Sequence, residues 1–316
     1  MQFQTLCWCS IAGRPAMCGG INMKRILIAG AGSYIGTSVE RYLQEYNAAK
    51  GSGWYQMDTI SLREESWENC DFSCYDVLFH VAGIAHADVG GVSQETKEMY
   101  YRVNRDLAVK TARKAKKDGV KQFIYMSSVI VYGDSAPVGK SKNITADTKP
   151  QPANFYGDSK LQAEKGLMQL SDESFRVALI RPPMIYGKGS RGNFPLLVKL
   201  ARRLPVFPDI SNERSMLYVE NLAEFIRLLI ESGRGGLFYP QNAEYTTTSR
   251  MVQAIGKAMG KKVRLTKALN PLVKLAGLVP GRIGGMADKA FGSLTIDQEL
   301  SRKDFDGYQI LSLIHI

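Results

Sequence analysis

The 316-residue sequence contains no long hydrophobic run. A helix that crosses a bilayer needs roughly 20 consecutive apolar residues, and the most apolar late stretch, "ALNPLVKLAGLV" (268–279), is interrupted by Pro271 and Lys274. Low-complexity tracts and internal repeats are also absent. Because 45% of the residues are hydrophobic and 22% are charged, we expect a soluble globular protein with a sizeable core, built as one large or two coupled domains.

Histidine and cysteine are scarce, with three and five residues. Neither His80 nor His86 has other potential ligands clustered around it, so we predict no metal site. Three of the cysteines fall within residues 1–22. The other two, Cys70 and Cys74, have no further cysteine or histidine close by, and an odd total gives no disulfide framework. The expected setting is a reducing cytoplasm.

Acidic residues are also few, 30 against 41 basic ones, which gives a formal charge of +11. Such a charge fits either a nucleic-acid surface or the attraction of small anions. The basic residues are scattered and are not interleaved with aromatic ones. This pattern favours small anionic ligands such as dinucleotides and nucleotide sugars, with no nucleic-acid or membrane partner.

Both ends of the chain look foreign to the fold. Residues 1–22 precede a natural-looking start, "MKRILIAG", at Met23, and lack the basic and continuous apolar segments of a signal peptide. We interpret them as a non-native leader from a start codon placed too far upstream; a lipoprotein or redox leader is the alternative. The last six residues, "LSLIHI" (311–316), resemble a translated sequencing adapter.

The body of the chain alternates apolar strands with amphipathic helices. "RILIAG" (25–30) predicts a strand, and "SYIGTSVERYLQEY" (33–46) predicts a helix with an apolar stripe. Continuous apolar strands separated by helices imply a parallel sheet covered on both faces. Further strands are expected at 55–63, 75–83, 121–128 and 175–182, and a helical stretch at 99–119.

The first turn from strand to helix reads "GAGSYIG". Glycines there permit a tight turn and a close approach of backbone to a pyrophosphate, which the free N–H groups of the helix N-terminus can bind. We therefore predict a dinucleotide site. Its residues are Gly30, Gly32, Ser33, Tyr34, Ile35 and Gly36.

The second strand should present a group to the adenosine ribose. Ser61 occupies the position where an acid is expected, and Arg63 follows it. This pair of residues favours NADP over NAD as the cofactor. Asp58 lies earlier in the strand and can be structural. The connection to the strand at 75–83 is short. A strand of the usual first half of such a sheet is therefore expected to be missing or compressed.

The stretch "FYGDSK" places Tyr156 and Lys160 one helical turn apart, so that both project from one helix face. Ser127 and Ser128 stand where the strand at 121–128 ends, at the sheet edge where ligands bind. A second Tyr/Lys pair of the same spacing, at 46 and 50, is not accompanied by serines at a strand end, and we interpret it as the end of a helix.

These motifs occur in the order found in the extended short-chain dehydrogenase/reductase family. The chain resembles that family, and specifically its NAD-dependent epimerase/dehydratase branch of UDP-glucose 4-epimerase-like proteins, over about residues 23–310. The motifs that carry the resemblance are "GAGSYIG" (30–36), "HVAG" (80–83), "YYRVNRD" (100–106), "MSSVIVYG" (126–133), "YGDSK" (156–160), "RPPMIYG" (181–187), "GNF" (192–194), "RSMLYVENLA" (214–223) and "LTID" (294–297).

The resemblance implies an α/β fold: a Rossmann-type doubly wound parallel sheet with a smaller C-terminal substrate-binding region. Residues 23–185 would form the dinucleotide-binding domain, to which a strand and helix at about 214–232 return. Residues 186–310 would mostly bind substrate. Family likeness also suggests a homodimer through two helices packed face to face.

The resemblance assigns Tyr156 as the acid/base for a sugar hydroxyl, with Lys160 favouring its ionised form and binding the nicotinamide ribose. Ser128 would hydrogen-bond the reacting oxygen. Asn104 matches the supporting asparagine of the family, although a helix-packing amide is an alternative. The implied cofactor is NAD or NADP. Its further contacts would be Ala82, Gly83, Ser127, Pro183 and Met184, and the substrate contacts would be Ser128, Asn193 and Arg214.

The reaction that these residues imply is 4-epimerisation of a UDP-sugar or related nucleotide sugar, by transient oxidation and hydride return. A 4,6-dehydratase carries Asp-Glu where this chain has Val129 and Ile130, so dehydration is disfavoured. A 4-keto-sugar reductase remains open because it uses the same triad. A non-catalytic NADP-sensing regulator is disfavoured because such proteins typically lack the Tyr/Lys pair, which this chain keeps. A steroid dehydrogenase is disfavoured because its apolar substrate offers no phosphate for Arg214 and Asn193 to bind.

Overall fold

The computed structural model describes residues 23–51, 53–85, 92–305 and 307–309. The predicted leader (1–22), His86 and the predicted tail (311–316) lie outside these residues. Among the described residues, no helix is both long enough and apolar enough to cross a membrane.

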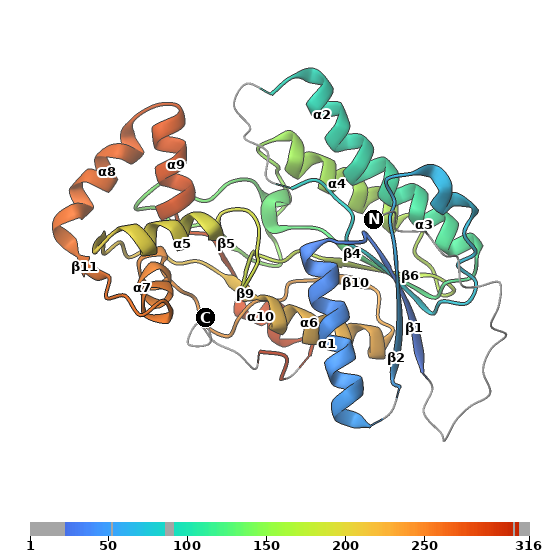
Figure 1. The fold of residues 1–316 in the computed structure, drawn as a ribbon. Helices are drawn as coiled ribbons and strands as arrows, with labels where there is room; N and C mark the ends of the chain where they lie inside the picture. Colours follow the sequence, from blue (N-terminus) through green and yellow to red (C-terminus); the bar gives the residue numbers. More distant parts are fainter. Residues whose placement is uncertain (1–22, 52, 86–91, 306, 310–316) are drawn as a thin grey trace.

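A six-stranded sheet forms the centre of the molecule, with the order β10-β6-β4-β3-β1-β2. All five pairings are parallel, so the carboxyl ends of the strands meet at one edge (Figure 1). The predicted parallel α/β sheet is confirmed. Its strands are β1 Lys24–Ala29, β2 Tyr55–Ile60, β3 Val77–His80, β4 Gln122–Met126, β6 Arg176–Ile180 and β10 Gly236–Phe238.

Alternating side chains of the strands belong to two separate cores. Ile26 and Ile28 of β1 pack in one hydrophobic cluster, and Leu27 and Ala29 pack in the other. This division follows from the two-residue period of a strand, and both clusters are apolar because both faces are covered. The continuous apolar runs in the sequence are explained in this way.

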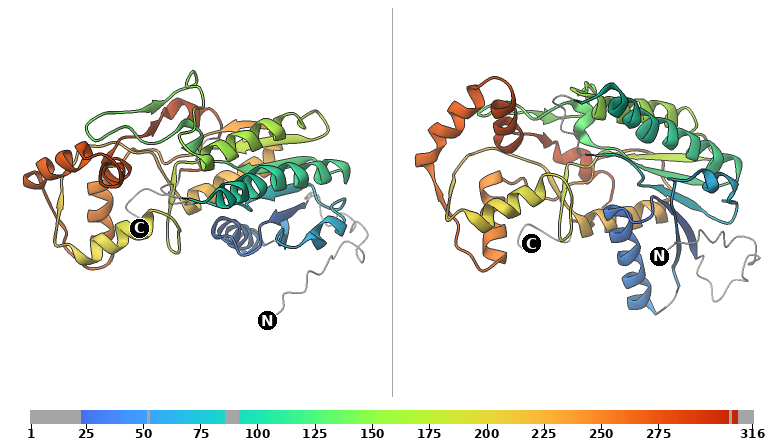
Figure 2. Two further views of the ribbon diagram at one scale, coloured as in Figure 1. Left: turned by 90° about the horizontal axis from the view of Figure 1, so that it is seen from above. Right: turned by 45° about the horizontal axis from the view of Figure 1, so that its top comes forward.

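Helices cover both faces of the sheet (Figure 2). One face carries α1 (Tyr34–Lys50) and α6 (Val219–Ser232), whose residues pack in the first cluster. The other face carries α3 and α4, whose residues pack in the second. The elements before and around this second layer are α2 Gln94–Tyr100, the π-helical turn η3 Tyr101–Asp106, α3 Leu107–Lys117 and α4 Phe155–Met168.

The connection from β2 to β3 is short, as predicted. It contains the 3₁₀ turn η2 (Glu65–Asn69), and β2 is an edge strand of the described sheet. The prediction of no disulfide was wrong, because Cys70 and Cys74 in this connection are both disulfide-bonded. An odd cysteine count for the whole chain says nothing about two cysteines in one loop.

The C-terminal part contains short elements around a third apolar cluster that includes Tyr186, Phe194 and Met251. Three two-stranded parallel pairs join distant segments: β7 with β9, β8 with β11 and β5 with β12. The strands are β5 Asn143–Ile144, β7 Met184–Tyr186, β8 Val206–Pro208, β9 Met216–Tyr218, β11 Arg264–Thr266 and β12 Thr295–Ile296. The helices are α5 Phe194–Arg203, α7 Thr248–Ala258, α8 Asn270–Leu278, α9 Arg282–Phe291 and α10 Gln298–Arg302, and the short turns are η4 Val129–Tyr132 and η5 Lys267–Leu269.

Candidate active site

The glycine turn after β1 brings two backbones unusually close together. Gly30 has a φ of 133°, and a Cβ on it would lie 2.7 Å from the backbone nitrogen of Ala82 and 2.9 Å from the side chain of Val81. No side chain fits there, and few L-residues adopt that φ. The turn after β1 therefore lies directly against the end of β3, where the sequence predicted a second cofactor contact.

The N-terminus of α1 is suited to a pyrophosphate. Ser33 caps the helix by accepting a hydrogen bond from the Gly36 amide at 3.2 Å, and the first turn holds no acidic residue. Gly32 has a φ of 72°, and a Cβ there would meet no heavy atom within 4 Å. Open space, free amides and the helix dipole together fit an anionic group. The chain's residues thus fit a dinucleotide.

Two residues of the predicted cofactor turn have further surroundings in the structure. Tyr34 points its hydroxyl toward the 187–189 loop, where a Cβ on Gly187 would lie 3.0 Å away. Among the described residues this buried hydroxyl has no hydrogen-bond partner. Ile35 packs against the first hydrophobic cluster, so its side chain supports the helix while its backbone belongs to the turn.

The end of β2 adjoins the glycine turn, because the Ile60 carbonyl accepts hydrogen bonds from the amides of Gly30 and Ala31. Ser61 follows at once, and its hydroxyl accepts from the Arg63 amide at 3.4 Å. Asp58 lies within the strand and accepts a hydrogen bond from the Tyr75 hydroxyl at 3.0 Å. The placement of Ser61 and Arg63 fits the ribose end of the cofactor, and Asp58 has a structural partner.

Ser128 and Tyr156 meet across the carboxyl edge of the sheet. Ser128 lies two residues beyond the end of β4 and caps η4, while Tyr156 lies in the first turn of α4, which Asn154 caps at 3.0 Å. Burial raises the pKa of Tyr156 to about 12; a hydrogen bond with Ser128 opposes this, and Tyr100 adds to it. The two hydroxyls predicted to act on one oxygen are therefore close neighbours at this edge.

Lys160 lies one turn after Tyr156 and is only 5% exposed. Its ammonium donates a hydrogen bond to the Met126 carbonyl at 2.8 Å and stands 4.7 Å from the centre of the Tyr125 ring. Burial lowers the pKa of Lys160 to about 8, and Glu164 opposes the shift. A Cβ on Gly83 would lie 3.3 Å from the ammonium, so Lys160 and the predicted cofactor loop are neighbours.

Asn104 connects the cofactor loop to the catalytic helix. The residue is fully buried, and its amide accepts a hydrogen bond from the Ile84 amide (2.8 Å) while donating to the Ile84 carbonyl (3.0 Å) and the Ser159 hydroxyl (3.1 Å). It lies in the π-helical turn η3, and its carbonyl accepts from Tyr125 at 2.9 Å. Since every polar group of its side chain is used, Asn104 fixes neighbouring elements in place.

Sequence reasoning missed a buried ion pair behind this site. Glu164 and Arg181 are joined by two hydrogen bonds, at 2.5 and 3.0 Å, and Glu164 also accepts one from the Ser127 hydroxyl. The guanidinium continues to the Tyr132 and Tyr239 hydroxyls at 2.6 and 3.2 Å. The available signal was the spacing of Glu164, one turn after Lys160. Ser127, predicted as a cofactor contact, thus directs its hydroxyl to Glu164.

The remaining predicted contacts lie in the C-terminal part and on its border. Pro183 is buried and Met184, the first residue of β7, is partly buried beside the third cluster. Asn193 is exposed at the start of α5. The structure does not bring any of these three into a hydrogen bond with the Ser128–Tyr156 pair in the described part of the chain.

Arg214 is held by neutral groups. Its guanidinium donates to the carbonyls of Lys289 and Gly292 at 2.7 and 3.3 Å, near the end of α9, and to the Ser135 hydroxyl at 3.4 Å. Burial lowers the pKa of Arg214, and no carboxylate pairs with it among the described residues. A positioned guanidinium without a counter-charge suits a phosphate.

His80 has a structural environment. It is fully buried at the end of β3, between the rings of Phe123 and Tyr125, with centroids 5.7 Å away in each case. Burial lowers the pKa of His80 to about 3, and Lys160 lowers it further. Among the described residues no group of three or more histidine, cysteine or acidic side chains is placed to hold a metal ion.

Two relatives show what this chain is similar to. A UDP-glucose 4-epimerase of Vibrio cholerae is 30% identical over 227 residues, which are 70% of this chain and 68% of the relative. The N-acetyl-alpha-D-glucosaminyl-diphospho-ditrans,octacis-undecaprenol 4-epimerase of Escherichia coli O157:H7 is 25% identical over 91% of this chain and 88% of its own.

The fold has counterparts among solved structures. The UDP-glucuronic acid 4-epimerase of Bacillus cereus, solved with NAD, superposes with a TM-score of 0.64 and 18% identity, over 92% of this chain and 95% of that one. The sequence profile of the NAD dependent epimerase/dehydratase family matches residues 26–239. The resemblance drawn from the motifs is confirmed: this chain is an enzyme of the NAD dependent epimerase/dehydratase family.

Proposed function

We propose that this chain is a nucleotide-sugar 4-epimerase acting on a UDP-hexose or UDP-N-acetylhexosamine. The observation that carries the proposal is the placement of Ser128 beside Tyr156, with Lys160 one helical turn further on, at the carboxyl edge of a parallel sheet with a dinucleotide-type turn. The relatives named above, which are 4-epimerases by name, support the same reaction.

The proposed roles of the residues follow from their atoms. The Tyr156 phenolate would take the proton from the 4-hydroxyl of the sugar and later return it, while the Ser128 hydroxyl donates to the same oxygen. A nicotinamide cofactor, which the glycine turn and Lys160 would hold, would supply reversible hydride exchange at C4, so no net oxidation occurs. Because burial raises the pKa of Tyr156 to about 12, the phenol needs a nearby positive charge to ionise at neutral pH.

Lys160 and Asn104 would hold this arrangement. The Lys160 ammonium has one hydrogen bond, to Met126, in the described part of the chain, and two of its three N–H groups are left to face the nicotinamide ribose beside Gly83. Asn104 fixes residue 84 to α4 through its bonds to Ile84 and Ser159. We therefore assign Asn104 as a positioning residue rather than a group that touches the substrate.

Arg214 and Asn193 would bind the diphosphate of the substrate. Arg214 is positioned by carbonyls near the end of α9 and has no described carboxylate partner, and Asn193 is exposed at the start of α5. The sugar would then extend from this site toward Ser128. We also propose that the division predicted from the sequence holds, with residues 23–185 binding the cofactor, helped by the segment at about 214–232, and residues 186–310 mostly binding the substrate.

A specific experiment separates epimerisation from the alternatives. The protein is incubated with UDP-glucose, UDP-galactose, their N-acetyl forms and a polyprenyl-diphosphate-linked N-acetylglucosamine, and products are identified by NMR. Interconversion without added reductant supports the proposal. Strict dependence on NADPH with a 4-keto substrate would establish the reductase instead, and cofactor binding without any turnover would indicate the regulator.

Tyr156→Phe tests the assigned acid/base. Removing the hydroxyl should lower kcat by at least about 10²-fold, the size of a lost general acid/base, and should leave cofactor binding measured by calorimetry unchanged. Tyr132→Phe is the matched control, since its hydroxyl bonds to Arg181 and Tyr239. Retained turnover in Tyr156→Phe would reject the proposed chemistry.

For the cofactor, we propose that Ser61 and Arg63 favour a 2′-phosphate, hence NADP over NAD. Ser61 follows the end of β2 where an acid would bind the free ribose hydroxyl, and Arg63 is exposed beside it. Mass spectrometry of the nucleotide released from purified protein measures the preference. Arg63→Ala should weaken binding of NADP but not of NAD, and equal loss for both would contradict this assignment.

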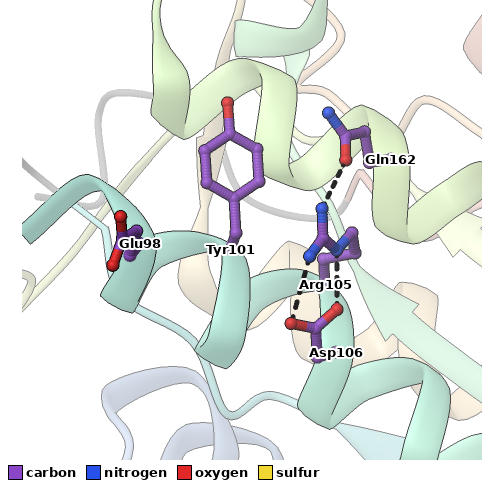
Figure 3. A pocket seen from close by; sticks show the side chains of 5 residues that line it. All are labelled: Glu98, Tyr101, Arg105, Asp106 and Gln162. Carbon is purple, nitrogen blue, oxygen red and sulfur yellow. Dashed lines mark hydrogen bonds and ion pairs between the residues drawn. The ribbon is translucent and has the colours of Figure 1, made fainter. Parts of the chain in front are cut away.

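We propose a homodimer through the outer face of η3, α3 and α4. Two pockets open on this face. One of 420 Å³ is lined by Glu98, Tyr101, Arg105, Asp106 and Gln162 (Figure 3). The other, of 560 Å³, shares Arg105, Asp106 and Gln162 with it and is also lined by Val109, Lys110, Arg113 and Gly166. Arg105 joins the helices by donating to Asp106 and Gln162. Light scattering of wild type and Val109→Glu measures the state; a dimer that persists in the variant would place the interface elsewhere.

We also propose a cytoplasmic location, because the proposed cofactor and nucleotide-sugar substrates are cytoplasmic metabolites. Fractionation of cells that produce the natural protein tests this. Free-thiol titration of Cys70 and Cys74 in protein from the same cells gives an independent measurement. Free thiols would support the proposal, since disulfides are rare in reducing compartments. Recovery in an oxidising compartment, with both cysteines bonded as in the structure, would contradict the proposal.

A further inference from the structure

Half of the exposed large apolar side chains in the described part of the chain gather on one helical hairpin. Twelve such side chains are exposed, and six belong to α8, α9 and the turn between them. Three leucines, Leu272, Leu275 and Leu278, are 62 to 79% exposed, and α8 has no buried residue. Single exposed apolar residues are ordinary, but a contiguous group marks an interaction surface.

The hairpin lies at the end of the molecule farthest from the six-stranded sheet (Figures 1 and 2). Its inner side is held to the body: the Asp288 carboxylate accepts a hydrogen bond from the Val138 amide at 2.8 Å, and a Cβ on Gly277 would lie 3.1 Å from the Val138 side chain. The outer side therefore faces away from the fold, with its apolar residues in solvent.

The segment that carries this surface is strongly basic. Residues 257–292 include eight lysines and arginines and one acid, Asp288, a formal charge of +7 out of +11 for the whole chain. Lys267, Lys274 and Lys289 are exposed on and beside the hairpin. Of the basic side chains of this segment that the structure describes, which are all except that of Arg282, none forms an ion pair.

We propose that the α8–α9 hairpin docks the enzyme on the surface of an anionic lipid bilayer. Exposed leucines next to unpaired lysines are the composition of helices that lie in the membrane interface, and anionic lipids attract each lysine near the surface. α8 has only nine residues, which suits lying on a membrane rather than crossing one. The proposal differs from the prediction made from the sequence, which was that the chain has no membrane partner.

Charge also decides between a bilayer and a second copy of the chain. A two-fold interface places the same patch on both subunits, so it would bring the exposed Lys274 and Lys289 of one copy close to those of the other, with Asp288 the single acid of α8 and α9. Like charges brought together in this way repel. An anionic surface neutralises the same residues, and it therefore accounts for both the leucines and the lysines.

The position of the hairpin has a consequence that rests on the proposed function. Arg214, the proposed diphosphate ligand, donates to the carbonyls of Lys289 and Gly292 near the end of α9. Because α9 has ten residues and spans about 15 Å, a docked hairpin would hold this site within about that distance of the lipid headgroups. A sugar diphosphate that is anchored in the bilayer could then reach Arg214, whereas a free nucleotide sugar would bind with or without docking.

Vesicle sedimentation of the full chain tests the docking surface without any activity measurement. Wild type should sediment with vesicles of phosphatidylglycerol and phosphatidylcholine and remain in solution with phosphatidylcholine alone. The triple variant Leu272→Ser, Leu275→Ser, Leu278→Ser should lose about tenfold or more in partitioning. Met168→Ser, which removes a single 43% exposed apolar side chain from α4, is the control away from the hairpin and should bind like wild type.

Reversal of charge gives a second, independent variant. Lys267→Glu with Lys274→Glu and Lys289→Glu should also lose about tenfold or more, and all variants should unfold at the wild-type temperature because the substituted side chains are exposed. Failure of wild type to bind anionic vesicles would overturn the proposal. So would equal loss in Met168→Ser, or a change of oligomeric state in the leucine variant with vesicle binding intact, which would identify a second copy as the occupant.

Discussion

The pH dependence of stability at Lys160 can be worked out from the structure. Burial lowers the pKa of Lys160 from 10.5 in the unfolded chain to about 8 in the folded protein. Between these two values the unfolded chain holds the proton and the folded protein does not, so raising the pH favours folding. The full difference of about 2.5 pH units corresponds to about 3 kcal/mol, of which about 2.5 kcal/mol falls between pH 7 and pH 10.

The perturbation that isolates this contribution is Lys160→Met. The variant has no titrating group at 160, and it leaves the Met126 carbonyl without its ammonium donor at every pH. The free energy of unfolding of wild type minus that of the variant should therefore rise by about 2.5 kcal/mol from pH 7 to pH 10. Below pH 7 the difference should be flat, because both states of the wild type are then protonated at Lys160.

Urea unfolding of the cofactor-free protein at each pH measures this difference. Lys165→Met is the matched control: Lys165 is exposed on the same helix, so the same substitution there removes a lysine without removing a buried ammonium. A flat curve for Lys160→Met would refute the reasoning, since it would mean that the ammonium at 160 is as well solvated as a surface lysine.

Three further substitutions test other parts of the site. Gly30→Ala should destabilise the fold by about 2–4 kcal/mol, because the new Cβ would lie 2.7 Å from the Ala82 nitrogen at a φ of 133°. Gly119→Ala is the control in urea unfolding, since Gly119 also has a positive φ but a Cβ there would meet open space. Equal losses of unfolding free energy in the two variants would contradict the predicted clash. Glu164→Gln should cost about 3 kcal/mol by leaving the buried Arg181 guanidinium without its carboxylate, and a loss below about 1 kcal/mol in the same assay would show that solvent or another group compensates. Arg214→Lys should raise KM for a nucleotide sugar about tenfold with kcat nearly unchanged, since lysine keeps the charge but not the fork of donors. An unchanged KM in steady-state kinetics would show that Arg214 does not bind the substrate.

Much of the fold was predictable because its signals are local. β1 and α1 are adjacent in the sequence, and the glycines between them report a turn that only certain backbones can make. The predicted strands agree with β1, β2, β3, β4 and β6 within a few residues. The predicted helix at 99–119 is interrupted by the π-helical turn η3, because Asn104 hydrogen-bonds to residues 84 and 159, which are distant in sequence.

The ion pair of Glu164 and Arg181 could not be predicted for a related reason. Glu164 reads as an ordinary polar residue of an amphipathic helix, and Arg181 as the end of a strand. Only the packing of α4 against β6 buries both side chains. Each charge can then be buried only because the other one neutralises it. The role of the stretch "ALNPLVKLAGLV" was also hidden, since its sequence shows apolar residues but not that the fold leaves them exposed.

The buried and partly buried cations of the site fall into two groups that differ in how they are neutralised. Arg181 has Glu164, and its charge is compensated within the protein. Lys160 and Arg214 donate instead to neutral carbonyl groups, and burial lowers the pKa of each. A cation held in that way costs stability, and the cost is recovered when an anion or a polar ligand arrives. Lys160 lies beside the cofactor loop and Arg214 lies near the end of α9. These positions therefore agree with the two ligands, a dinucleotide and a nucleotide sugar, that a sugar-nucleotide epimerase must bind together.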